Sequence, residues 1–94
     1  MPGRILYFGR NAAMMSLVGQ QLSAAGMKAE GYMDEAKLEL ELAKGDTKLL
    51  VIGGGVEDGP RTRLKGLCAK QGILVLEHSE GPGSLPGNIS NALG

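Results

Sequence analysis

Tryptophan is absent from this sequence, and cysteine and histidine occur once each, as Cys68 and His78. A single cysteine allows no intramolecular disulfide and no multi-cysteine metal site, which is typical of proteins from a reducing compartment. The aromatic residues are limited to Tyr7, Phe8 and Tyr32. Three aromatic side chains are too few for the stacking platforms that bind single-stranded nucleic acid.

The sequence also has no excess charge of either sign, because 10 Lys and Arg residues offset 10 Asp and Glu residues. A neutral chain has no general attraction for nucleic acid or for an anionic membrane, so we expect neither as a partner. No run approaches the roughly 18 apolar residues of a membrane-spanning helix. The amino-terminal stretch MPGRILYFGR has too few apolar residues for a signal-peptide core. We therefore expect a cytoplasmic protein.

Glycine, by contrast, is abundant, with 16 residues among 94, more than twice the usual share of about 7%. The length and the 43% content of hydrophobic residues suit one small domain that spans residues 1–94. Segments typical of strands alternate with segments typical of helices, and glycines separate them. This alternation predicts a parallel sheet covered by helices.

Four segments have the composition of strands. They are RILYF at 4–8, MKAEGYM at 27–33, KLLVI at 48–52 and ILVL at 73–76. The first, third and fourth are continuous apolar runs, as in strands that are buried on both faces. The second alternates apolar and polar residues, which is typical of a strand at the edge of a sheet.

Helices are expected between these strands. The segment EAKLELELAKG alternates in hydrophobicity as a strand does, but its residues favour helices, and parallel strands need a covering element between them. The next helix is expected to be capped by Asp58 or Gly59 with Pro60 near its first position, and Gly66 within it suggests a close packing contact. The tail, 79–94, is expected to form a loop and one short terminal helix.

Right-handed crossovers give these strands the order 2-1-3-4, in a three-layer α/β domain of Rossmann or flavodoxin type. The switch point then lies between the first and third strands, and binding crevices open there at the carboxyl ends of the strands. The candidate ligand-binding residues at this edge are Gly9, Arg10, Asn11, Gly53, Gly54, Gly55, Glu77 and His78. The fourth strand is apolar but lies at an edge, which predicts that the terminal segment or a second copy covers it, as in a homodimer.

The order of segments from Arg4 to His78, including LSAAGMKAEGYMDEAKLEL, resembles the receiver domain of bacterial response regulators. In that family, two acids after the first strand and an aspartate at the end of the third hold a magnesium ion and accept the phosphoryl group. The matching positions are Gly9, Arg10 and Gly53, so all three acids are absent. The resemblance therefore implies a receiver-like shell without phosphoryl transfer, such as a regulatory or protein-interaction module.

Residues 49–77 resemble instead the dinucleotide-binding unit of flavin and nicotinamide enzymes. Gly53 and Gly55 follow a strand and precede a helix, and Glu77 lies where that family places the acid that binds the ribose. Asp58 occupies the position of the third glycine in the family's motif. This resemblance implies that a nucleotide or another anion is the ligand, whereas a purely structural explanation is that the glycines allow the positive φ of a sharp turn.

Two functions therefore remain open from the sequence. The first is a non-enzymatic regulatory or protein-interaction module without a cofactor, and the alternative is a protein that binds a nucleotide or another small anion. An enzymatic function would need Glu77 and His78 as an acid–base pair. Cys68 lies on the apolar face of its helix and is expected to be an unreactive buried thiol. The basic segment RTRLK, 61–65, is interpreted as a solvated helix face.

Overall fold

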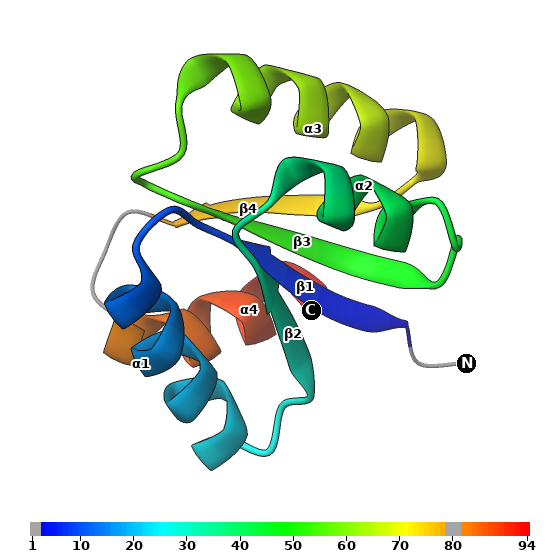
Figure 1. Ribbon diagram of the computed structural model, residues 1–94. Coiled ribbons are helices and arrows are strands. Elements are labelled where there is room, and N and C mark those ends of the chain that lie inside the picture. Colours follow the sequence, from blue (N-terminus) through cyan, green and yellow to red (C-terminus); the bar gives the residue numbers. More distant parts are fainter. Residues whose placement is uncertain (1–2, 79–81) are drawn as a thin grey trace.

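The computed structural model describes residues 3–78 and 82–94, which form a four-stranded parallel sheet between two layers of helices (Figure 1). The strands are β1 (Arg4–Phe8), β2 (Ala29–Tyr32), β3 (Thr47–Gly53) and β4 (Leu74–His78). Their order is β2-β1-β3-β4, so the predicted topology and the three-layer α/β class are confirmed. The helices are α1 (Ala12–Ala24), α2 (Glu35–Leu42), α3 (Asp58–Gln71) and α4 (Leu85–Leu93), and a 3-10 turn (Pro82–Ser84) precedes α4.

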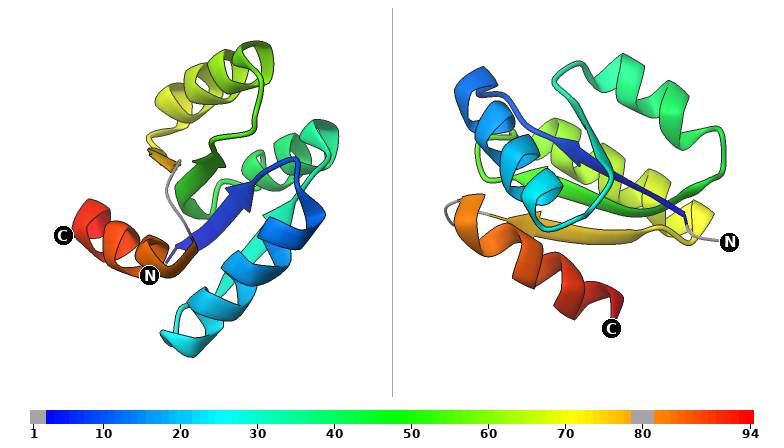
Figure 2. Two further views of the ribbon diagram at one scale, coloured as in Figure 1. Left: turned by 90° about the vertical axis from the view of Figure 1, so that its left-hand side faces the viewer. Right: turned by 90° about the horizontal axis from the view of Figure 1, so that it is seen from below.

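Helices α2 and α3 cover one face of the sheet, and α1 and α4 cover the other (Figure 2). Successive residues of β3 supply both layers, since Leu50 packs with α2 and α3 whereas Leu49 packs with α1 and α4. Burial on both faces requires the continuous apolar runs of β1 and β3, and these strands are the two central ones. Their carboxyl ends therefore lie side by side at the switch point.

The alternating segment around residues 35–42 is a helix, as expected. Leu38 and Leu42 are fully buried four residues apart, whereas Leu40 between them is 70% exposed. Asp34 caps the helix, because its Oδ1 accepts a hydrogen bond from the backbone N–H of Ala36 at 2.9 Å. The leucine alternation thus combines one buried helical pair with one solvent-facing side chain.

Several element boundaries differ from the expected ones. β4 begins at Leu74 and continues to His78, because Gly72 ends α3 in the left-handed region, at φ 72°, and Ile73 follows as a connection. The predicted packing contact at Gly66 is wrong, because a Cβ atom at this position would meet nothing within 4 Å. The expected terminal helix is present as α4, while residues 79–81 of the expected loop lie outside the described residues.

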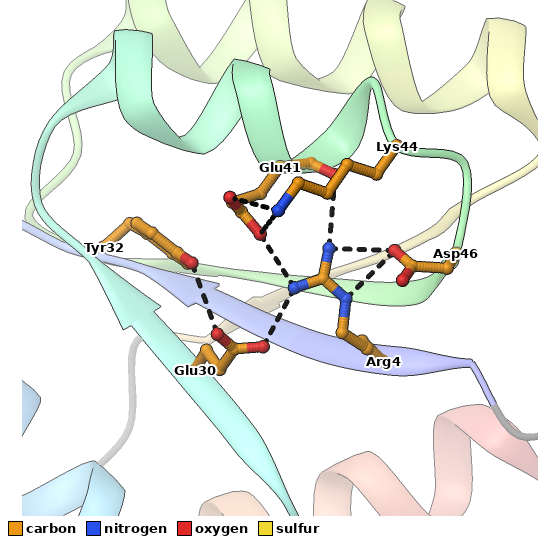
Figure 3. A network of polar contacts seen from close by, with 6 residues as sticks. All are labelled: Arg4, Glu30, Tyr32, Glu41, Lys44 and Asp46. Carbon is orange, nitrogen blue, oxygen red and sulfur yellow. Dashed lines mark hydrogen bonds and ion pairs between the residues drawn. The ribbon is translucent and has the colours of Figure 1, made fainter.

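A network of charged side chains surrounds Arg4 at the amino end of β1 (Figure 3). Its guanidinium group contacts the carboxylates of Glu30 at 2.9 Å, Glu41 at 2.8 Å and Asp46 at 2.8 Å. Lys44 lies 3.0 Å from Glu41 as well. Arg4 therefore ties β2, α2 and the loop before β3 to the central strand, at the end opposite the switch point.

In the described ranges, 3–78 and 82–94, no helix is both long and apolar enough to cross a membrane.

Candidate functional site

A crevice of about 420 Å³ opens at the carboxyl ends of β1 and β3, between the start of α1 and the start of α4. The structure brings seven of the eight predicted candidates into its lining, and Glu77 is the exception. The lining residues are Tyr7, Phe8, Gly9, Arg10, Asn11, Met14, Met15, Val18, Val51, Gly53, Gly54, Gly55, His78 and Leu85. The crevice therefore combines bare backbone at its rim with a largely apolar wall.

The three glycines form a turn between β3 and α3 that does not depend on positive φ. Val56 N–H donates to the carbonyl oxygen of Gly53 at 3.2 Å, which closes the turn. Positive φ among the described residues occurs at Gly26, Gly45, Gly72 and Gly94, so the explanation by positive φ is wrong for the three glycines. A Cβ atom at Gly53 would lie 3.4 Å from the carbonyl oxygen of Phe8, but one at Gly55 would meet nothing within 4 Å. Gly55 instead leaves the backbone uncovered at the crevice.

Arg10 and Asn11 form the opposite rim, and both side chains are already engaged. Arg10 Nε donates to Glu57 at 2.9 Å, and Nη1 donates to the carbonyl oxygen of Met33 at 2.8 Å. Asn11 caps α1, because its Oδ1 accepts a hydrogen bond from Met14 N–H at 3.0 Å. The pairing with Arg10 also lowers the pKa of Glu57, so this carboxylate stays charged and held by the guanidinium.

The guanidinium of Arg10 also lies over the ring of Phe8, 4.9 Å from its centroid. Phe8 packs in the layer of α2 and α3, on the face of the sheet opposite α1 and α4. Glu57, which follows the glycine turn, is thus paired with Arg10 at the edge of that layer, and it is not among the described lining residues of the crevice.

His78 and Glu77 are neighbours in β4, and the structure separates them. His78 lines the crevice, is 8% exposed, and has its Nδ1 3.3 Å from the amide nitrogen of Asn88 in α4. Glu77 contacts Arg61 at 2.8 Å and Lys65 at 3.1 Å on α3, and these cations lower the pKa of its carboxyl group. Consecutive strand residues face opposite sides of a sheet, so Glu77 and His78 form no acid–base pair.

Tyr7 forms part of the apolar wall, and two glycines make room for its ring. A Cβ atom at Gly31 in β2 would lie 2.5 Å from Cε2 of Tyr7, and one at Gly19 in α1 would lie 2.9 Å from its hydroxyl oxygen. Burial raises the pKa of the Tyr7 phenol above its usual value, so it stays neutral at neutral pH. These glycines are explained by packing against one aromatic side chain.

Sequence reasoning missed the contributions of Asn88 and Arg61 to this edge of the sheet. Asn88 lies in the terminal helix and reaches His78, while Arg61 contacts the glycine turn from behind. The spacing of leucines in the tail indicates α4 but gives no sign that a polar residue on it meets β4. Arg61 was interpreted as part of a solvated face, yet its side chain is only 19% exposed.

The site offers no metal centre or reactive thiol in the part of the chain that the structure describes. No three His, Cys, Asp or Glu side chains gather there in a way that could hold a metal ion. Cys68 is fully buried on the side of α3 that packs in the core, and burial raises the pKa of its thiol to about 11. The prediction of a buried, unreactive cysteine agrees with this environment.

Comparisons with known proteins inform on the fold alone. No family model and no curated protein sequence matches this chain. Among solved structures, it is similar to a de novo designed Rossmann 2x3 fold protein determined by solution NMR, with a TM-score of 0.71 and 12% sequence identity. The similarity covers 95% of this chain and 70% of the designed one. The chain is therefore a Rossmann-like α/β domain.

Proposed function

We propose that this domain binds a small organic molecule in the crevice at the switch point. The observation that carries the proposal is the crevice itself, whose volume of about 420 Å³ lies within the range of about 300–1,000 Å³ of known ligand sites. Its position at the carboxyl ends of β1 and β3 is where open parallel sheets hold ligands. Among the described lining residues there is no carboxylate, which favours an anionic or neutral ligand over a cation.

The lining suggests a ligand with two unlike ends. Tyr7, Val18, Val51 and Leu85 provide an apolar wall for a hydrophobic body. Met14 and Met15, which are unbranched and flexible, can adjust to bodies of different shape. The glycine turn and the start of α1 provide backbone N–H groups for a polar or anionic end. A nucleotide or another anion with an apolar part fits this description.

A thermal-shift screen tests the proposal with flavin mononucleotide, adenosine monophosphate, phenyl phosphate and inorganic phosphate. A ligand at a hundred times its Kd adds about 2.7 kcal/mol to the free energy of unfolding. For a domain of this size, that corresponds to a rise in Tm of more than about 10 °C. We expect a rise with at least one of the organic anions and little or none with inorganic phosphate. Unchanged melting with every compound contradicts the proposal.

Two leucine variants show whether the ligand occupies the crevice. Gly55→Leu adds a side chain at the rim, where a Cβ atom meets open space, and should abolish the ligand-induced rise in Tm. Gly66→Leu is the matched control, because its Cβ atom also meets nothing within 4 Å and Gly66 lies on α3 outside the crevice. A rise in Tm of the same size in Gly55→Leu and in Gly66→Leu would place the ligand elsewhere.

We also propose, as a second function, a regulatory or protein-interaction role for the receiver-like shell. The edge of β4 favours it, because among the described residues β4 pairs only with β3, and Leu74 is 51% exposed. An apolar edge strand can pair with another chain, and a second copy of this chain is the partner we favour. Gly9, Arg10 and Gly53 replace the acids of a receiver site, so this role involves no phosphoryl transfer.

A further inference from the structure

The side chain of Met15 lies against Gly9, at the point where β1 ends. A Cβ atom at Gly9 would be 2.9 Å from Sδ of Met15 and 3.8 Å from its Cγ, so a side chain at residue 9 would displace the thioether. Long side chains of a helix point back toward its amino end, which brings Met15, near the start of α1, to this position. Gly9 and Met15 both line the crevice. The thioether of Met15 therefore lies at the switch point, beside the crevice.

Met14 adds a second thioether to the same part of the lining. It is 44% exposed, although it is a large apolar residue, and it lines the crevice next to Met15. Val18 is the other residue of α1 in the described lining. A methionine side chain is unbranched and flexible, so both thioethers can settle against the body of a ligand. The wall that α1 contributes to the crevice is thus made largely of thioethers.

The residue type of this wall carries information about the ligand. Leucine would serve an aliphatic ligand equally well, because leucine and methionine fill similar volumes. The crevice does use aliphatic side chains elsewhere, at Val18, Val51 and Leu85. A thioether differs from these in its polarisable sulfur, which makes favourable contacts with aromatic rings, often at the ring edge. Two neighbouring thioethers therefore favour an aromatic ring over a saturated body of the same size.

We propose that the apolar part of the ligand is an aromatic ring and that Met14 and Met15 select this ring over a saturated one. The inference rests on the proposed function and narrows it, from small organic molecules to aromatic compounds with a polar or anionic end. Each contact between a sulfur and a ring is worth about twofold to tenfold in affinity. Met14 and Met15 are thus specificity-determining residues, whereas the aliphatic wall contacts either kind of ring.

NMR of the methionine methyl groups tests the contact in the unmodified protein, with phenyl phosphate and cyclohexyl phosphate as probes. The two compounds share a head group and have nearly the same size, but only the phenyl ring has a ring current. Phenyl phosphate should shift the methyl signals of Met14 and Met15 several times more than cyclohexyl phosphate does. The signals of Met27 and Met33, which are not among the described lining residues, should stay in place. Shifts of the same size from both compounds, or shifts confined to Met27 and Met33, overturn the inference.

Two double variants separate the selection of a ring from simple packing. Replacement of Met14 and Met15 by leucine keeps the volume of the wall. Measured by calorimetry, it should weaken binding of phenyl phosphate about fivefold and binding of cyclohexyl phosphate less than about twofold. Replacement of Met27 and Met33 by leucine is the matched control, because it also changes one half-buried and one exposed methionine, and Met33 is 40% exposed. This control should leave both affinities unchanged.

The outcomes distinguish the choice of ring from the proposed function. Equal weakening of both compounds in the variant of Met14 and Met15 overturns the inference but leaves the proposed function standing. If only a nucleotide of the thermal screen binds, its affinity should fall about fivefold in that variant, and an unchanged affinity overturns the inference. The methyl spectra need no variant, so they decide the question even if a leucine variant does not fold. If the unmodified protein binds neither probe nor any compound of the thermal screen, the proposed function fails, and the choice of ring fails with it.

Discussion

At the scale of single residues, Gly31 shows how one missing side chain shapes the crevice wall. Because a Cβ atom there would lie 2.5 Å from the ring of Tyr7, Gly31→Ala must displace the ring from its place in the packed wall. We expect a loss of about 1–3 kcal/mol in the free energy of unfolding, the usual cost of overpacking. Urea denaturation followed by circular dichroism measures this loss.

Gly55→Ala is the matched control for that substitution. Its Cβ atom meets nothing within 4 Å and its φ is not positive, so we expect the free energy of unfolding to change by less than about 0.5 kcal/mol. A Gly31→Ala protein as stable as the unmodified one would show that Tyr7 moves freely, and it would remove the packing explanation for Gly31.

The candidate residues that sequence reasoning could identify are those whose position follows from the strand ends. Gly9 and Gly53 lie directly after apolar runs, so the parallel topology alone brings them together. Arg61 could not be recognised in this way, because its partners come from the end of β3, the turn and β4. Glu77 was misplaced, since the sequence shows that it ends a strand but not that α3 supplies two cations to hold it.

At the scale of elements, α3 contains a glycine that the fold does not require. Gly66 is exposed within the helix, its φ is not positive, and a Cβ atom there would meet nothing within 4 Å. Gly66→Ala should therefore raise the free energy of unfolding by about 0.5–1 kcal/mol, because alanine loses less backbone entropy in a helix. Thermal denaturation should show a rise in Tm of several degrees. A lower Tm would mean that this position has a packing role.

The sequence predicted the kinds of elements well but their ends less well. The segment of alternating leucines was assigned correctly because helix propensity and the need for a crossover outweighed its period of two. The predicted cap of α3 at Asp58 or Gly59 is wrong, because the helix begins at Asp58 and Glu57 is its N-cap, without any side-chain hydrogen bond to mark the boundary. Tertiary contacts of Pro60 and Leu64, both buried, fix this helix instead.

At the scale of the whole molecule, ion pairs between elements make stability depend on pH. Hydrogen bonds from Arg63 and from Arg4 lower the pKa values of Glu35 and Glu41, respectively. Each carboxyl group is therefore a stronger acid in the folded chain than in the unfolded chain. Below about pH 5 the unfolded chain binds more protons, so the free energy of unfolding falls as the pH falls through the folded pKa values. Urea denaturation at several pH values between neutral and acid measures this dependence.

Removal of one partner of an ion pair should weaken the dependence of the free energy of unfolding on pH. Arg63→Gln deletes the bidentate contact with Glu35, so its stability should fall less steeply with decreasing pH. Lys28→Gln makes the same change in charge at a residue that has no ion pair in the described part of the chain, and it should keep the original slope. Equal slopes in the Arg63→Gln variant and the unmodified protein would contradict the contribution of Glu35.

The open edge of β4 makes a prediction for the assembly of the molecule. α4 packs on β4 from one face of the sheet, but within residues 3–78 and 82–94 the strand partner of β4 is β3 alone, so its outer edge is open there. Two copies that pair their β4 strands around a twofold axis would form one continuous sheet and cover Leu74, which is 51% exposed. We therefore expect light scattering to show a dimer as the protein concentration rises.

Leu74→Lys places a charge at this edge and should give a monomer, whereas Leu40→Lys, at a leucine that is 70% exposed on α2, should still dimerise. A monomer at high concentration, or the same loss of dimer in both variants, would show that β4 is not the interface.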